Sequence, residues 1–114
     1  MKTTTASTTL LPASVASYLD AANRFDATAA ADSFAADASV HDESHDYVGR
    51  NAIRAWVAET SRKYRPAFTV LRAAVNGDDV SLSVAVSGQF PGSPVTLDYQ
   101  LRLSGGKIST LTIE

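Results

Sequence analysis

The spacing of apolar side chains changes at Pro66, and this change constrains the fold of the 114-residue chain more than any other feature. Before Pro66, apolar residues recur every three or four positions, which places them on one face of a helix. After Pro66 they alternate with polar residues, which places them on one face of a half-buried strand. A chain whose helices precede its strands in this way is typical of an α+β domain.

Three turn signals divide the second half of the chain into four strands. They are Asn76-Gly77, the run GQFPGSP at 88–94, and Gly105-Gly106. Asn and Gly tolerate positive φ angles, and a segment so rich in Gly and Pro does not belong inside a sheet. Short turns join antiparallel strands, so we expect a curved, four-stranded antiparallel sheet. One of its faces carries the Val and Leu residues that pack against the helices.

The first half contains three helical segments. The first, residues 12–25, starts at a proline whose missing N–H costs nothing in the first turn of a helix. Asp26 is a typical N-cap and predicts a second, short helix that continues to Phe34. Apolar residues at i, i+3 and i+4 indicate a third helix over residues 50–64. It ends before Pro66, because a proline disfavours helical geometry in the preceding residue.

The densest group of ionisable side chains lies in FAADASVHDESHDYVGRNAIRAW at 34–56. Residues 38–42 alternate in a way that predicts a short strand, and an acidic loop then leads to the third helix. In a strand, Val40 and Asp42 point to the same face and His41 points to the other. In a small α+β cone, Val40 and Asp42 share the inward face of this strand, so we expect Asp42 to place one carboxylate inside the domain.

The length supports one domain over residues 12–114, preceded by a Thr/Ser-rich, disordered tail at 1–11. The chain has 10 basic and 12 acidic side chains and no basic run, so neither nucleic acid nor an anionic membrane is an expected partner. It has no cysteine, which excludes a disulfide, a thiolate metal site and a Cys nucleophile. It has no apolar run of about 18 residues and no signal-peptide core, so we expect a cytoplasmic protein.

The order helix, helix, short strand, helix and four strands resembles the nuclear transport factor 2-like superfamily over residues 14–113. Its members include ketosteroid isomerases, limonene epoxide hydrolase and the polyketide-cyclase-like, or SnoaL-like, proteins. The most similar local run is 34–56: an aromatic residue, an acidic and Ala-rich stretch, a short strand ending in Asp, then Gly-Arg and a helix. The resemblance implies a cone-shaped α+β barrel of cystatin-like topology, with 12–114 as a SnoaL-like domain.

The resemblance also implies a homodimer. The face of the predicted sheet that points away from the helices carries polar residues: Thr96, Gln100, Arg102, Ser81, Ser83 and Ser87. An interface on such a polar surface is expected to be moderate in area and to contain water.

Two residues fall on catalytic positions of the ketosteroid isomerases. In that family a Tyr on the first helix donates a hydrogen bond to the developing enolate, and an Asp at the end of the short strand shuttles the proton. Tyr18 and Asp42 align with these positions without a gap. The family's second donor is a carboxylic acid, and the aligned residue here is Tyr99, whose phenol can also donate. The resemblance therefore implies Asp42 as general base and Tyr18 with Tyr99 as oxyanion donors.

Each of these side chains also has a purely structural explanation. Asp42 could cap the third helix or lie in solvent, and a buried Tyr often serves only the core once its hydroxyl has found a partner. Phe34, Trp56 and Leu97 are the expected ligand-binding walls around Asp42, and Trp56 is also a candidate for the core. His45 is expected near the mouth of the pocket as a second acid–base group.

The histidines and acids between 41 and 46 do not form a predicted metal site. His41 and Asp42 point to opposite faces of a strand, so they cannot easily share one ion. Two histidines without the i, i+4 spacing of a helix are a weak ligand pattern. The sequence also has no Gly-rich nucleotide-binding loop, so we expect no cofactor.

Three functions remain open on these grounds. The first is a cofactor-free isomerase, cyclase or hydrolase that acts on a small, largely apolar molecule through Asp42, Tyr18 and Tyr99. The second is a non-catalytic module that holds such a molecule in the same cavity. The third is a protein-interaction domain that uses the open face of the sheet. A buried Asp42 with a phenol in reach favours the first, an apolar cavity with Asp42 in solvent the second, and a filled interior the third.

Overall fold

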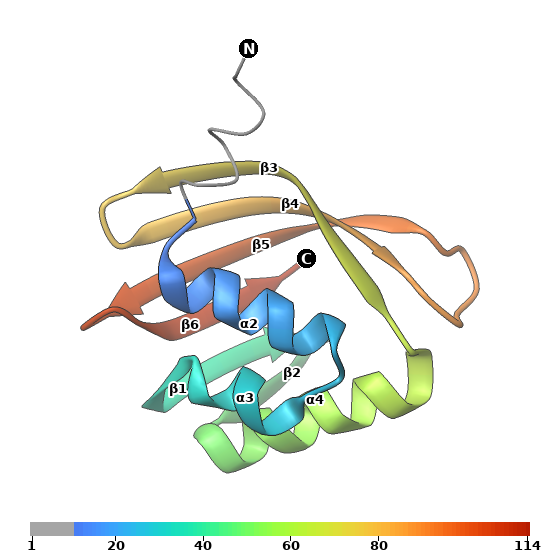
Figure 1. Cartoon of the computed structure of the whole chain (residues 1–114), viewed down its shortest axis with the longest axis horizontal. Helices are drawn as coiled ribbons and strands as arrows, with labels where there is room; N and C mark the ends of the chain where they lie inside the picture. The colour runs from blue at the N-terminus through green and yellow to red at the C-terminus, as the bar shows by residue number, and fades with distance from the viewer. Residues whose placement is uncertain (1–10) are drawn as a thin grey trace.

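The computed structural model describes residues 11–114, which form three helices and one six-stranded sheet (Figure 1). The helices are α2 (Ala13–Asn23), α3 (Ala27–Asp32) and α4 (Arg50–Tyr64). The strands are β1 (Phe34–Asp42), β2 (His45–Val48), β3 (Ala67–Asn76), β4 (Asp79–Ser87), β5 (Val95–Ser104) and β6 (Lys107–Ile113). No helix in this part of the chain is long and apolar enough to cross a membrane.

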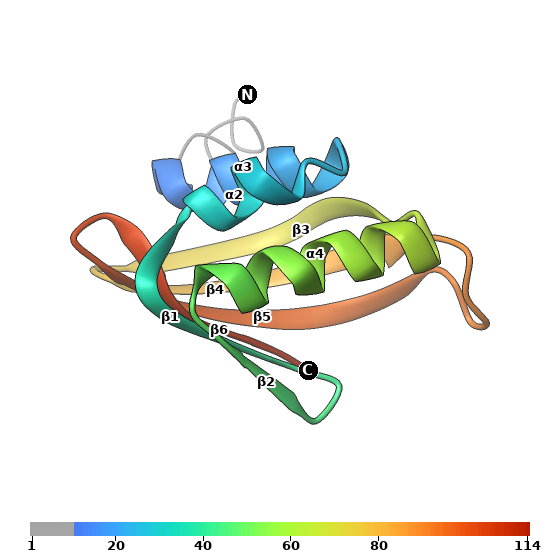
Figure 2. The same ribbon diagram turned by 90° about the horizontal axis from the view of Figure 1, so that it is seen from below.

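The strands form one curved sheet in the order β2-β1-β6-β5-β4-β3. Neighbouring strands are antiparallel except β1 and β6, which run parallel. The helices lie on one side of the sheet, within its curvature (Figure 2). Helix α2 contacts β3 and β6, while α4 contacts β1 and β2, so the two longer helices cover different parts of the concave face.

The prediction of a four-stranded antiparallel sheet with one short extra strand is wrong in two respects. Strand β1 begins at Phe34, where the second helix was expected to end, and it pairs in parallel with β6. Strand β2 occupies part of the predicted acidic loop and forms a hairpin with β1. Its turn, Glu43-Ser44, has φ angles of 52° and 65°. Such positive angles suit a two-residue hairpin turn, but Asn-Gly usually marks it, so the sequence carries no clear signal for this one.

Local signals predict both ends of α4 and the start of α3, while α2 ends at Asn23, two residues before the predicted Phe25. Helix α4 spans the predicted residues and ends where Arg65 adopts a left-handed φ of 49° before Pro66. The Asp26 carboxylate caps α3, because its Oδ1 accepts a hydrogen bond from the Ala29 N–H at 3.0 Å. Helix α3 is shorter than predicted, since the chain turns into β1 after it.

Alternation on β4 and β5 turns one face of the sheet towards the core, as predicted. Val80 and Tyr99, for example, are 1% and 2% exposed. On β3 a bulge breaks the alternation at Leu71, which the sequence pattern assigns to the same face as Ala73. Leu71 is therefore 56% exposed, while Ala73 packs against the core.

The core lies between the helices and the concave face of the sheet. Completely buried side chains in it include Phe34, Val40, Ile53 and Ile108. Leu11, the last residue of the predicted tail, packs against this core, while residues 1–10 of that tail lie outside the described residues.

The loop 88–94 between β4 and β5 packs onto the end of α4. The Gln89 N–H donates to the Tyr64 carbonyl oxygen at 2.7 Å, and the rings of Phe90 and Tyr64 meet edge-on with centroids 5.8 Å apart. A Cβ atom at Gly88 would lie 2.6 Å from the same carbonyl oxygen, so only glycine permits this close approach. The contact holds two aromatic rings from distant segments beside each other.

Candidate functional site

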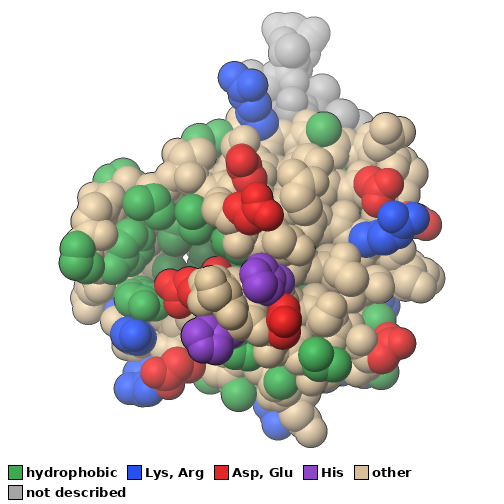
Figure 3. Space-filling view, turned by 180° about the vertical axis from the view of Figure 1, so that it is seen from behind, with side chains coloured by type: hydrophobic (Ala, Val, Ile, Leu, Met, Phe, Trp, Pro, Cys, Tyr) green, Lys and Arg blue, Asp and Glu red, His purple; other side chains and the backbone are tan. Residues whose placement is uncertain are grey.

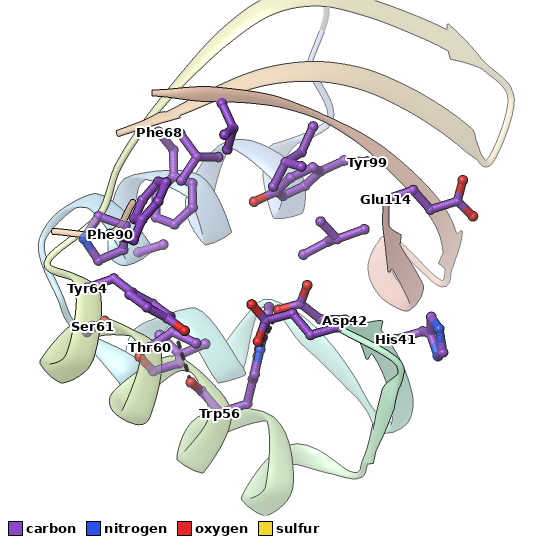
Figure 4. Close-up of a pocket in the computed structure, with 18 of the residues that line it drawn as sticks. His41, Asp42, Trp56, Thr60, Ser61, Tyr64, Phe68, Phe90, Tyr99 and Glu114 are labelled. Carbon is purple, nitrogen blue, oxygen red and sulfur yellow. Dashed lines mark hydrogen bonds between the residues drawn. The ribbon is translucent and has the colours of Figure 1, made fainter. Parts of the chain in front are cut away.

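A cavity of about 560 Å³ is lined by the concave face of the sheet, α2 and α4 (Figure 4). Small-molecule sites in proteins usually enclose about 300–1,000 Å³. Most of the lining residues are apolar or aromatic. In the space-filling view a hollow is bordered by hydrophobic side chains on one side and by His and acidic side chains on the other (Figure 3). Such a lining suits a largely apolar molecule that carries a few polar groups.

Asp42 is the half-buried carboxylate of this cavity. It ends β1, and the alternation of the strand turns it to the same side as Val40, which is fully buried in the core. The Trp56 indole N–H donates a hydrogen bond to Asp42 Oδ2 at 3.1 Å. Burial raises the pKa of the Asp42 carboxyl, the hydrogen bond from Trp56 opposes this shift, and the charge of Glu43 adds to it.

Tyr18 of α2 and Tyr99 of β5 bring two phenols to the same cavity. Both side chains are 2% exposed, and no hydrogen bond to another described residue engages either hydroxyl. Burial raises the pKa of both hydroxyls, and the negative charge of Asp42 acts in the same direction. The two phenols therefore stay protonated at neutral pH and can donate hydrogen bonds to a ligand. Figure 4 shows the Tyr99 hydroxyl pointing into the cavity.

Trp56 has a role that the sequence does not assign to it. The sequence predicts a wall or core residue, and Trp56 does line the cavity, but its indole also holds the Asp42 carboxylate. Its ring stacks on Tyr47 of β2, with centroids 5.8 Å apart and planes at 29°. A buried Trp usually finds a partner for its N–H, and this rule was the only available signal for the bond to Asp42.

The remaining predicted ligand-binding residues differ in position. Leu97 lines the cavity. Phe34 does not: it is completely buried behind Tyr18, whose ring it meets edge-on with centroids 5.3 Å apart. His45 is also outside the lining, because the unpredicted hairpin turn directs it to solvent, where its Nδ1 donates to the Glu43 carbonyl oxygen at 2.9 Å.

His41 lies at the edge of the site rather than inside it. Its Nδ1 is 2.7 Å from Asp46 Oδ1 on the neighbouring strand β2, and Figure 4 shows its ring directed away from the other lining residues. Within residues 11–114 no three His, Asp or Glu side chains are close enough together to hold a metal ion.

One wall of the cavity was not predicted at all. It is made by the end of α4, the start of β3 and the loop 88–94, which contribute Tyr64, Phe68 and Phe90. The only signal for this wall in the sequence was a bulky aromatic residue inside a Gly- and Pro-rich turn. We call the open side of the cavity its mouth and define it by four partly or fully exposed lining residues, Glu43, Ser44, Tyr64 and Phe90.

Solved structures with the same architecture come from several bacteria. A candidate polyketide cyclase from Sinorhizobium meliloti is 38% identical, with a TM-score of 0.87 over 91% of this chain and 95% of that one. A ketosteroid isomerase-like protein from Catenulispora acidiphila, in complex with trimethylamine, is 24% identical, with a TM-score of 0.80 over 90% and 85% of the two chains. A cystatin-fold protein from Novosphingobium aromaticivorans is 16% identical, with a TM-score of 0.76 over 89% of this chain and 94% of that one.

A comparison with curated protein sequences gives no significant match. The structural likenesses establish the fold, an α+β arrangement with a curved sheet and cystatin-like relatives. The sequence profile of the SnoaL-like domain matches residues 15–110, which span all three helices and nearly the whole sheet. The chain therefore belongs to the SnoaL-like domain family.

Proposed function

We propose that the cavity binds a small, largely apolar carbonyl compound and that Asp42, Tyr18 and Tyr99 act on it without a cofactor. The observation that carries this proposal is the meeting of one half-buried carboxylate and two phenols, without hydrogen-bond partners among residues 11–114, in a single, mostly apolar cavity. The reaction class is that of an isomerase, cyclase or hydrolase. The 38% identity to a candidate polyketide cyclase supports the cyclase within this group.

The chemistry follows from the charges and donors in the cavity. Asp42 takes a proton from the carbon next to the carbonyl group, or from a water, and becomes neutral as negative charge moves to the substrate oxygen. A raised pKa at Asp42 makes this transfer easier, since it makes the carboxylate a stronger base. Tyr18 and Tyr99 donate hydrogen bonds to the oxygen on which the charge develops. Trp56 holds one carboxylate oxygen and so orients the other towards the substrate.

A non-catalytic binding module is the second candidate function. Tyr99 favours this second function. In the family pattern a carboxylic acid stands at its position, and a phenol is a weaker acid and a weaker hydrogen-bond donor than a carboxylic acid. Burial raises the pKa of the Tyr99 hydroxyl and so weakens it further as a donor. A cavity of about 560 Å³ counts against a domain that acts only through the outer face of its sheet.

The single tryptophan of the chain, Trp56, lines the cavity and reports on ligand binding directly. We expect a bicyclic ketone such as decalone to change Trp56 fluorescence in a saturable way. We also expect its α-hydrogens to exchange with deuterium oxide, which NMR detects, because abstraction of that proton is the step assigned to Asp42. Saturable binding without exchange would support the binding module, and the absence of both for a series of such ketones would contradict the proposal.

We further propose that the protein is a homodimer through the outer face of the sheet. This face is polar, with Ser81 donating to Gln100 at 2.8 Å, but it also exposes the apolar side chain of Leu71. Light scattering at micromolar concentration is expected to give about twice the 12.0 kDa of one chain. The variant Leu71→Asp should lower the measured mass towards that of one chain, because it places a charge in the proposed dimer interface. A wild-type mass of a single chain would refute the dimer.

A further inference from the structure

The charged residues that line the cavity are acidic, apart from His41, whose ring pairs with Asp46 at the edge of the site. The lining includes the acidic residues Asp42, Glu43 and Glu114 and, within the described residues, no Lys or Arg. Glu114 points away from the other lining residues in Figure 4, so the field inside the cavity comes mainly from Asp42 and Glu43. An apolar cavity with charges of one sign attracts ligands of the opposite sign, because its walls screen the field poorly.

The cavity also contains polar groups that need a partner. The Tyr18 and Tyr99 side chains are 98% buried, since 2% of each is exposed, and no hydrogen bond to a described residue engages their hydroxyls. Both hydroxyls are open to the cavity, since the described residues contain one fully enclosed side-chain polar atom without a partner, and that atom is Ser14 Oγ. These phenols therefore mark the inner part of the cavity as a place where a ligand supplies a polar group.

An ammonium group of the protein itself lies beside the mouth. Lys63 Nζ lies 5.1 Å from the centroid of the Tyr64 ring. The Tyr64 hydroxyl, and not its ring, is the main cause of a raised pKa at the exposed Lys63, and the charges of Glu43 and Glu59 add to this shift. An aromatic face with a carboxylate nearby is the usual environment of a bound organic cation.

We infer that the cavity selects organic cations, that is, molecules with an apolar body and an ammonium group. The ammonium group lies at the mouth, between the Glu43 carboxylate and the Tyr64 ring, where Lys63 competes with it. The apolar body fills the cavity, and a neutral polar group reaches Tyr18 and Tyr99. This inference rests on the proposed function and names the ligand class for the same site. A carboxylate ligand, in contrast, brings its charge close to Asp42 and Glu43 and meets no Lys or Arg among the described lining residues.

Three ligands of one shape test the inference by calorimetry: naphthylmethylammonium, naphthylmethanol and naphthoate. We expect the ammonium compound to bind about tenfold more tightly than the alcohol, as a cation–π contact next to a carboxylate allows, and naphthoate to bind more weakly than both. Naphthoate binding as tightly as naphthylmethylammonium would overturn the inference. If the alcohol still binds, the proposed small-molecule cavity stands, whereas failure of all three contradicts the cavity as well.

Two substitutions of exposed residues test the position of the ammonium group. They are expected to change the affinity ratio of the ammonium compound to the alcohol in opposite directions. Glu43→Gln should lower the affinity ratio of ammonium to alcohol severalfold, because it removes the carboxylate that lines the mouth. Lys63→Gln should raise the same ratio, because it removes the competing cation. Asp37→Asn is the matched control: this acid is exposed on β1 but lies outside the cavity lining, so the ratio should stay unchanged. An unchanged ratio in Glu43→Gln would contradict the assignment to the mouth.

Discussion

Asp42→Asn is expected to lower the rate of α-hydrogen exchange in a bound ketone by about 10²–10⁴-fold, the usual contribution of a general base. The amide keeps the size of the side chain and can still accept the hydrogen bond from Trp56, so the affinity for the ketone should change little. NMR in deuterium oxide measures the exchange, and Trp56 fluorescence measures the binding. Asp98→Asn is a matched control, since Asp98 precedes Tyr99 but is exposed on the opposite face of β5.

The same variant should change the dependence of stability on pH. The pKa of Asp42 is raised from its ordinary value of 3.8, so the native protein binds more protons than the unfolded chain between the two pKa values. Protonated Asp42 thus contributes stability that is fully present below the ordinary pKa and is lost as the pH rises through the folded pKa. Urea titrations at several pH values should show this slope in the wild type and not in Asp42→Asn.

Carbon-13 NMR of the carboxyl groups measures the Asp42 pKa directly. We expect a value above that of a free peptide in the wild type. In Trp56→Phe we expect a still higher value, because the hydrogen bond that stabilises the charged form is lost. A carboxyl that titrates as in a free peptide, together with unchanged exchange in Asp42→Asn, would leave the proposed enzyme without its base.

Phe34→Ala is expected to lower the free energy of unfolding by about 3–5 kcal/mol, as large-to-small substitutions of buried aromatic residues do. Phe34 is completely buried and supports Tyr18 through an edge-on ring contact, so its removal leaves a cavity beneath α2. Urea denaturation followed by circular dichroism measures the loss. Val48→Ala, at a position 67% exposed, should change stability by no more than about 0.5 kcal/mol.

The variant Phe34→Leu, which is more conservative than Phe34→Ala, separates a role of Phe34 in packing from a role in ligand binding. Phe34→Leu should retain the fold, and its affinity for a ketone should stay within a few-fold of the wild type, because Phe34 does not line the cavity. A folded Phe34→Leu protein that has lost all ligand binding would instead return Phe34 to the binding residues that the sequence pattern suggests. A stability loss below about 1 kcal/mol in Phe34→Ala would contradict its place in the core.

Sequence alone determined the features of this protein that depend on neighbouring residues. The bounds of α4 follow from its apolar spacing and from Pro66, and the Asp26 cap follows from the residue type. The inner face of β4 follows from strict alternation, as does the shared side of Val40 and Asp42. These features are readable because helices and strands have fixed periods, so a side chain's direction relative to its neighbours is set locally.

Only the tertiary structure decided the features that join distant segments. They include the parallel pairing of β1 with β6, the bond from Trp56 to Asp42, and the wall formed by Tyr64 and Phe90. Periodicity shows which side of an element faces inward, but it does not show which inward side chains meet or which of them border a cavity. Phe34 illustrates this: it faces inward as expected, yet it packs behind Tyr18 instead of lining the cavity. Such outcomes depend on how the elements pack in space, and no local pattern encodes that packing.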